Sequence, residues 1–408
     1  MKRLLATVGT TTLLCGAVLL SLGAGLAAQS AAKSSLSFAP TISIASPILY
    51  PSGIAAGDIN HDGVQDLGVT GVEEGGLCSA LGLRRPSSTG RYLAPWICGE
   101  AGADAPWLLQ FVDIDLDGNL DVVSTDGDEP VVAIAFGDGT GHFSTAPYLS
   151  SDCGFATRQA AVADLNGDGI PDIVATVLID GSGPGCIAIF LGQGGGQFAP
   201  AQEIDSGGIN PFSIAVGDMN NDGIPDLVVV NTGNPEQGVY GSLAVLLGKG
   251  DGTFRQPIIY SSGIYEFTDA IVGDFNRDGK LDVAVVANGV NGVIVYPGKG
   301  NGALSSPKVY PAGEVPWFVV TADFNGDGIP DLAVGNYTNP KPCYVSVILG
   351  NGDGSFQPPV HFRVGVSPLQ LITADFNGDG KPDIATVNGG DSTISILLNT
   401  TPWPAKSK

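Results

Sequence analysis

The sequence predicts an all-β fold, a seven-bladed β-propeller whose blades have four strands each. Three observations lead to this prediction: a nonapeptide that recurs seven times, short apolar runs around each copy, and an unpaired strand-like segment near the N-terminus. The 408 residues include 60 glycines and 28 prolines, so turns interrupt the chain often. Many short strands are therefore expected rather than long helices.

The nonapeptide returns every 49 to 56 residues. Its copies are DINHDGVQD at 58, DIDLDGNLD at 113, DLNGDGIPD at 164, DMNNDGIPD at 218, DFNRDGKLD at 274, DFNGDGIPD at 323 and DFNGDGKPD at 375. A period of this length is typical of propellers and other repeat architectures.

Each copy lies between two short apolar runs, as QAAVAD and DIVATV flank the copy at 164. A third run follows, for example CIAIFLG, and then a glycine-rich turn such as GDGTGHF (137–143) that opens a fourth run with an aromatic residue. Apolar runs bounded by glycine and proline read as strands. Each period therefore holds four strands, which is the content of one propeller blade.

The two ends of the chain predict how the ring closes. The last repeat stops after its third run (394–398), whereas residues 36–44 precede the first copy and match the fourth-strand pattern. We expect this N-terminal strand to complete the last blade, which leaves no bare sheet edge there. The prediction is one propeller domain, residues 33–400, followed by a C-terminal tail, residues 401–408.

The N-terminus reads as a secretory signal peptide, residues 1–32. Lys2 and Arg3 precede an apolar stretch from Leu4 to about Ala28, with small residues after it. An uncleaved membrane anchor is the alternative, because the stretch is long enough to cross a bilayer. No second apolar run of that length occurs, so the mature chain is expected to be secreted, extracellular or periplasmic, or held at the cell surface, with no membrane span.

Five cysteines remain after export: Cys78, Cys98, Cys153, Cys186 and Cys343. An oxidising compartment permits disulfides. Local pairing would join Cys78 to Cys98 and Cys153 to Cys186, although the sequence leaves the connectivity open. An odd number leaves at least one thiol outside intramolecular disulfides.

The nonapeptide has the composition of a calcium loop. Calcium takes six to eight oxygen ligands, and a tight turn with acids at alternate positions can direct them at one centre. The proposed ligands are the side chains at positions 1, 3, 5 and 9 and the carbonyl at position 7, for up to seven Ca²⁺. They are Asp58, Asn60, Asp62, Val64, Asp66; Asp113, Asp115, Asp117, Asn119, Asp121; Asp164, Asn166, Asp168, Ile170, Asp172; Asp218, Asn220, Asp222, Ile224, Asp226; Asp274, Asn276, Asp278, Lys280, Asp282; Asp323, Asn325, Asp327, Ile329, Asp331; and Asp375, Asn377, Asp379, Lys381, Asp383.

Other uses of the loop fit less well. An EF-hand needs an acid at position 12 and flanking helices, whereas here position 12 is apolar or a small hydroxyl residue and the flanks are strand-like. Magnesium prefers a tighter shell with several waters, and zinc would need clustered His or Cys. Metal-free Asp-Gly turns remain an alternative, but turn chemistry alone does not require acids at positions 1, 5 and 9.

The net charge of −23 follows largely from these loops, which carry 22 of the 41 acidic residues. Calcium would neutralise much of it. Nucleic-acid binding is disfavoured, because the sequence has no basic patch.

At the nonapeptides and glycine turns, the sequence resembles the FG-GAP and VCBS-type repeat proteins, which are related in architecture to the seven-bladed propeller of integrin α subunits. The resemblance covers residues 36–400 and implies the same calcium ligands. Two departures occur: Leu304 replaces the turn aromatic in GKGNGAL, and the first blade has GLCSALGLRRPSSTGRY in place of a compact turn. Relatives include adhesion modules, carbohydrate binders and accessory domains of enzymes, so the resemblance leaves the activity open.

The face opposite the calcium loops is the predicted ligand face. Six residues before each first aspartate stand Ser52, Trp107, Arg158, Phe212, Thr268, Trp317 and Leu369. Trp107, Phe212 and Trp317 would ring the mouth of the channel, where aromatic side chains can stack on a sugar or anchor a partner. Their alternative role is to plug the channel.

The function expected from the sequence is a monomeric, non-catalytic adhesion or binding module for an extracellular protein or glycan. The alternative is a polysaccharide lyase or hydrolase that uses acids of this face, such as Asp104, Asp128, Glu129 or Glu314, together with calcium. The scarcity of histidines and the lack of hydrolase motifs weigh against an enzyme.

Overall fold

The computed structural model describes residues 36–71, 76–82, 93–179, 184–261, 263–337 and 343–403. The chain divides into two units, Met1–Lys33 and Ser34–Lys408, and every described residue belongs to the second. The predicted signal peptide and residues 404–408 of the predicted tail lie outside the described residues. No helix in the described part of the chain is long and apolar enough to cross a membrane.

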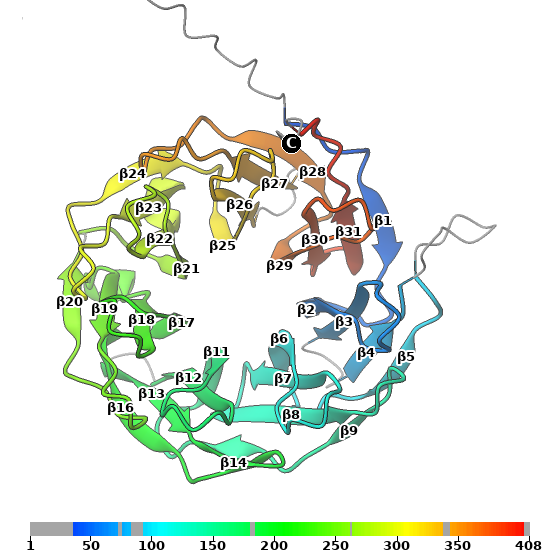
Figure 1. Cartoon of the computed structure of the whole chain (residues 1–408), viewed down its shortest axis with the longest axis horizontal. Coiled ribbons are helices and arrows are strands. Elements are labelled where there is room, and N and C mark those ends of the chain that lie inside the picture. Colours follow the sequence, from blue (N-terminus) through cyan, green and yellow to red (C-terminus); the bar gives the residue numbers. More distant parts are fainter. Residues whose placement is uncertain are drawn as a thin grey trace, which may run out of the picture. The chain divides into compact units, whose positions relative to one another are not determined.

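Seven antiparallel sheets are arranged around a central axis, which confirms the predicted seven-bladed β-propeller (Figure 1). In blades 1 to 6 the strands follow one another from the axis outwards in chain order. The inner strands are β2 (Pro51–Gly57), β6 (Pro106–Val112), β11 (Ala156–Ala163), β17 (Pro211–Gly217), β21 (Phe267–Gly273), β25 (Pro316–Ala322) and β29 (Pro368–Ala374).

The second strand of every blade begins at the ninth residue of a nonapeptide. These strands are β3 (Asp66–Gly71), β7 (Asp121–Asp126), β12 (Asp172–Leu178), β18 (Asp226–Asn231), β22 (Asp282–Ala287), β26 (Asp331–Asn336) and β30 (Asp383–Asn388). Each nonapeptide therefore connects the first and second strands of its blade, as the sequence predicts.

The third and fourth strands form the outer half of each blade. Third strands are β4 (Gly76–Ala80), β8 (Val131–Gly137), β13 (Pro184–Phe190), β19 (Ser242–Leu246), β23 (Gly292–Tyr296), β27 (Cys343–Ile348) and β31 (Thr393–Leu397). Outer strands are β5 (Ile97–Glu100), β9 (Phe143–Thr145) with β10 (Leu149–Ser150), β16 (Gln202–Ile209), β20 (Ile258–Ser261), β24 (Lys308–Pro311) and β28 (Val360–Val364). The remaining elements are the hairpin strands β14 (Gly192–Gly194) and β15 (Gln197–Phe198) and the 3₁₀ turns η1 (Pro235–Gln237) and η2 (Asn288–Val290).

The N-terminal strand closes the ring, as expected. β1 (Ile42–Ala45) pairs with β31 and supplies the outer strand of blade 7. The contact continues beyond both strands, because the Thr400 N–H donates to the carbonyl of Ser37 at 2.9 Å. The predicted tail is partly built into the same closure: Thr401 is fully buried and its hydroxyl donates to that carbonyl at 3.1 Å.

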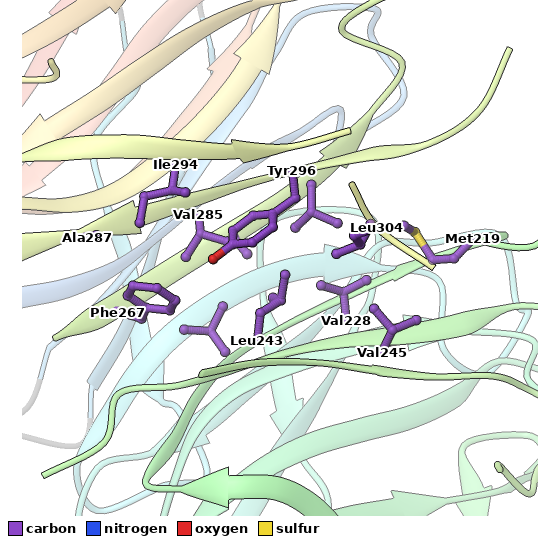
Figure 2. Close-up of a cluster of buried hydrophobic side chains, with 13 residues drawn as sticks. Met219, Val228, Leu243, Val245, Phe267, Val285, Ala287, Ile294, Tyr296 and Leu304 are labelled. Carbon is purple, nitrogen blue, oxygen red and sulfur yellow. The ribbon is translucent and has the colours of Figure 1, made fainter. Parts of the chain in front are cut away.

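The hydrophobic core is divided into clusters between neighbouring blades. Every residue of the second strands is buried, because both faces of each sheet are covered by the adjacent blades. Figure 2 shows one cluster, in which Val228 and Leu243 of blade 4 meet Val285 and Ile294 of blade 5. Each such side chain contributes roughly 1.5–3 kcal/mol when fully buried, and this packing explains the unbroken apolar runs in the sequence.

Both suggested disulfides are present. Cys78 on β4 faces Cys98 on β5 as a cross-strand pair, and Cys153 is bonded to Cys186 of β13. Cys343 lies buried at the start of β27, where its sulfur accepts a hydrogen bond from the Ser367 N–H at 3.4 Å.

Candidate functional site

All seven nonapeptides share one hydrogen-bond pattern. In the copy at 164, Asp164 accepts the N–H groups of Asp168 and Gly169 at 3.1 and 2.8 Å. Asn166 also accepts the Asp168 N–H, and Asp168 in turn accepts the N–H of Ile170. The same four contacts occur in the other six loops. Backbone N–H groups thus fix the acidic side chains of positions 1, 3 and 5 on the inside of one turn.

Two left-handed residues produce this turn. Position 6 is glycine in every copy, with φ between 75° and 94°, a conformation that glycine adopts without steric cost. Position 4 is also left-handed in every copy, with φ between 59° and 76°, yet it is glycine in only three. The glycine at position 6 is invariant among the seven copies, whereas position 4 shows no common residue type, because residues as different as His61, Leu116 and Arg277 occupy it.

The aspartate at position 9 ties each loop to the outer half of its own blade. Asp172 accepts the Leu165 N–H at 2.8 Å with one oxygen and the Gly192 N–H at 2.7 Å with the other. The same two contacts, from position 2 and from the end of the third strand, recur in the other six blades. Sequence reasoning assigned these aspartates to metal only; the structure gives them this second, structural role.

Burial raises the pKa of every position-9 carboxyl, and the nearby acids of the same loop raise it further. The pKa reaches about 7 for Asp331 and for Asp383. The two N–H donors oppose the shift but do not outweigh burial. Loss of the proton at neutral pH therefore costs folding free energy unless a positive charge compensates it.

The loop at 113 provides the strongest fit to a cation. Carboxylate oxygens of Asp113, Asp115 and Asp117 lie within 4.8 Å of one another, and hard oxygen donors at such spacing match the preference of calcium. Each carboxylate oxygen keeps lone pairs beyond those that accept N–H groups. The residues present therefore fit a calcium ion.

Two loops carry their own counter-charge. Lys280 and Lys381 stand at position 7, with their Nζ atoms 3.2 and 3.5 Å from the carboxylates of Asp278 and Asp379. Such exposed pairs are worth little by themselves. They nevertheless place a lysine on a carboxylate that the calcium hypothesis assigns to metal.

On the opposite face, the predicted ring residues lie at the start of the inner strands and contact one another. The Arg158 guanidinium carbon lies 5.3 Å from the Trp107 ring centre and 6.0 Å from that of Phe212. Phe212 meets Trp317 edge-on at 5.7 Å, and Trp317 meets Tyr337 at the same distance. We call these five residues, Trp107, Arg158, Phe212, Trp317 and Tyr337, the axial aromatic chain. Sequence reasoning did not assign ligand roles to Arg158 and Tyr337.

The axis is filled beneath this chain. Leu108 of blade 2 and Phe318 of blade 6 are both buried in one cluster, against which Trp107 and Trp317 pack. A polar belt lies at the same level: Asp269 accepts hydrogen bonds from the Ser213 hydroxyl at 2.8 Å and from the Val319 N–H at 3.0 Å. The aromatic rings thus rest on packed side chains, so a ligand would reach them from the solvent side of this face.

Bulges in the inner strands free backbone N–H groups for this polar belt. Pairing between the first and second strands shifts register near the start of the inner strand in all seven blades. Such bulges release N–H groups and redirect side chains. Gln370 accepts the Ile54 N–H of blade 1 at 2.9 Å in this way, which links blades 7 and 1.

The acids considered for catalysis belong to two blades. Asp104 precedes β6, and Asp128 and Glu129 follow the end of β7. The side chain of Asp126 accepts the backbone N–H groups of all three. Glu314 precedes β25 in blade 6. The first three are therefore gathered by the loop structure of blade 2, and Glu314 comes from a different part of the ring.

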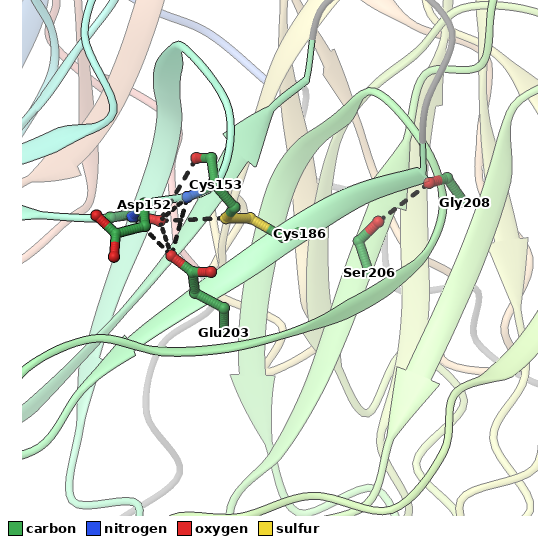
Figure 3. The surroundings of a disulfide bond; sticks show 7 residues. Asp152, Cys153, Cys186, Glu203, Ser206 and Gly208 are labelled. Atoms are coloured by element: carbon green, nitrogen blue, oxygen red, sulfur yellow. Dashed lines mark hydrogen bonds between the residues drawn. A yellow bond between two sulfur atoms is a disulfide. The ribbon is translucent and has the colours of Figure 1, made fainter.

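A cavity of about 460 Å³ lies between the outer strands of blades 2 and 3, and the sequence did not indicate it. Tyr148, Asp152, Phe198 and Glu203 are among its lining residues. Figure 3 shows how Glu203 fixes one wall, because it accepts the N–H groups of Asp152 and Cys153 at 2.7 and 2.9 Å beside the disulfide. This bond network crosses from one blade to the next, which no local pattern reveals.

Comparisons with known proteins agree with this architecture. A family model for the FG-GAP-like repeat matches residues 113–175, 176–229, 232–285, 274–334 and 323–386. Human integrin alpha-7 is 30% identical over 143 residues, which cover 31% of this chain and 12% of that protein.

Solved structures support the fold alone. The structure of BBS1N in complex with ARL6DN has a TM-score of 0.60 at 13% identity, and the match covers 92% of this chain and 99% of that chain. An Agrocybe aegerita lectin that recognises non-reducing terminal N-acetylglucosamine has a TM-score of 0.52 at 19% identity, with 89% and 86% coverage. Because the repeat model matches well over half of the sequence, the chain belongs to the FG-GAP-like repeat family.

Proposed function

We propose that this protein is a secreted, calcium-stabilised binding module that recognises an extracellular protein or glycan on the face opposite its nonapeptide loops, without catalysis. The observation that carries the proposal is the axial aromatic chain, which links side chains of four blades at the axis. Aromatic rings that are only partly covered offer a large contact area at low entropic cost. A lectin of similar fold from Agrocybe aegerita recognises non-reducing terminal N-acetylglucosamine, so glycans belong among the ligands to be tested.

Calcium supports this role by holding the opposite face together. The oxygen cluster of Asp113, Asp115 and Asp117 and the shared turn geometry of all seven loops favour a divalent ion. Calcium would neutralise charge that otherwise repels within each loop. The ligand face would then rest on a rigid ring.

Secretion is supported by the N-terminal signal pattern and by two disulfides, which persist in oxidising compartments.

Binding to a panel of glycans and extracellular proteins, measured in calcium, tests the proposed face. Trp107→Ala and Trp317→Ala should each weaken binding about tenfold or more, in the range of truncated aromatic anchors. Tyr148→Ala is the matched control, because Tyr148 is an exposed aromatic on the outer rim. Unchanged affinity in both tryptophan variants, at unchanged melting temperature, would end the proposal.

A further inference from the structure

Arg158 is the unusual member of the axial aromatic chain. Its guanidinium makes no hydrogen bond or ion pair with any residue that the structure describes, although the side chain is partly buried between Trp107 and Phe212. Burial lowers the pKa of Arg158, and Asp128 opposes this through its charge without forming a bond. A charge that is held partly out of water without a hydrogen-bonded partner is energetically unfavourable. Contact with ring faces recovers only part of that cost.

Neighbouring ring positions share the same lack of partners. The buried Nε atom of Arg158, the indole nitrogens of Trp107 and Trp317 and the hydroxyl of Thr268 are all without a hydrogen-bond partner within the described part of the chain. These four residues belong to the seven equivalent positions six residues before the first loop aspartate. Buried donors in folded proteins are nearly always paired. Four of the eleven unpartnered buried atoms in the described part of the chain therefore lie at this one level of the axis, where an acceptor group would satisfy them.

The electrostatic setting permits an anion at this place. None of the seven ring residues is acidic, and 22 of the 41 acidic residues of the chain lie in the nonapeptides at the other end of the inner strands. The acids of this face are Asp104, Asp128, Glu129 and Glu314, and Asp269 lies buried in the polar belt beneath the ring. Of these, Asp128 is the acidic group that acts on Arg158. A guanidinium offers five N–H donors and binds a carboxylate through two parallel hydrogen bonds.

Building on the proposed function, we propose that the ligand is an acidic glycan and that the carboxylate of one uronic acid residue binds Arg158 within the axial aromatic chain. The faces of Trp107 and Trp317 would cover the apolar face of the sugar ring, while the guanidinium takes its carboxylate. The face offers one cation, Arg158, among several aromatic side chains, which matches a sugar residue that carries a single carboxylate. An acidic peptide would bring consecutive flexible charges, for which this face would need several cations.

The test uses a glucuronate-containing oligosaccharide and its carboxyl-reduced, neutral counterpart. Wild-type protein in saturating calcium should bind the acidic form about ten- to a hundredfold more tightly, as expected for hydrogen bonds to a charged group. Arg158→Gln should remove this preference, and Arg158→Lys should restore it only in part, because lysine lacks the planar pair of donors. Arg255→Gln is the control, since it removes an equal charge from an exposed site in the outer turn of blade 4.

The outcomes separate this inference from the proposed function. If wild-type protein binds both sugars equally, and Trp107→Ala but not Arg158→Gln weakens binding, the binding face stands and the carboxylate assignment falls. If a polyglutamate peptide is bound and the acidic sugar is not, the glycan assignment is wrong. If nothing in the panel binds, both proposals fail. The neutral sugar makes the test independent of whether Arg158→Gln folds.

Discussion

At the scale of single residues, the left-handed position 4 of the nonapeptides imposes strain where it is not glycine or asparagine. Leu116 adopts φ of 64° and is 54% exposed. Burial of its side chain therefore does not offset the left-handed backbone conformation, which costs roughly 1–2 kcal/mol of folding free energy. Leu116→Asn should therefore raise the free energy of unfolding by about 1 kcal/mol in urea titrations. Leu116→Ala keeps the unfavourable backbone and should change little. Equal stabilisation by both variants would contradict the backbone explanation.

Asp269 makes stability depend on pH at the axis. Burial raises its pKa to about 6, against an ordinary value near 4, despite hydrogen bonds from the Val319 N–H and the Ser213 hydroxyl. The native state thus holds this proton more tightly than the unfolded state. The stabilisation is complete below about pH 4 and is lost as pH rises to about 6, a change of roughly 3 kcal/mol.

Comparison with Asp269→Asn isolates this effect. The unfolding free energy of the wild type relative to the variant should fall by about 3 kcal/mol between pH 4 and pH 7. All other titrating groups are common to both proteins. A parallel profile for Asp269→Asn would show that Asp269 titrates normally.

At the scale of elements, the pairing of β1 with β31 is the contact that closes the ring, and we expect stability to depend on it. Ile42 and Ile44 pack on the cluster between blades 7 and 1, and Phe38 meets Phe362 at 4.7 Å. Removing residues 36–46 would expose these side chains and the edge of β31, at a cost of about 5 kcal/mol from apolar area. The melting temperature should drop by on the order of 10 °C. A chain that begins at Leu36 is the control, and a negligible difference between the two would reject closure as a source of stability.

The strands and loops could be predicted because they depend on local signals. Apolar runs, the invariant glycine and the acids of each nonapeptide located the first two strands of every blade and the turn between them. The unpaired N-terminal segment even predicted β1. The hydrogen bond that Asp269 accepts from the Val319 N–H and the bonds that Glu203 accepts could not be predicted, since each joins a side chain to the backbone of another blade.

The ligand face was only partly predictable for the same reason. The repeat alignment places Trp107, Phe212 and Trp317 in one ring, because equivalent positions of a propeller face the axis together. It does not indicate that Arg158 lies between two aromatic rings, nor that Tyr337 extends the chain from a different connection. Side-chain length and loop path decide those contacts.

At the scale of the whole molecule, the seven buried position-9 carboxyls make the effect of pH depend on metal. Their pKa values are raised, to about 7 for Asp331 and Asp383, so in a chelator the native state holds protons that the unfolded state has lost. The melting temperature in EDTA should therefore fall as pH rises from 5 to 8.

If the loops bind calcium as proposed, the ion should reverse this trend, because it would bind the ionised carboxylates and compete with protons. At a hundredfold excess over its dissociation constant, each occupied loop would gain about 2.7 kcal/mol, so the difference in melting temperature between calcium and EDTA should widen towards pH 8. Equal ionic strength supplied by sodium chloride controls for simple screening, which acts on exposed charges and cannot offset burial. Coincident melting curves in calcium and EDTA at both pH values would mean that the loops are stable turns without metal, and the charge on that face would then need another explanation.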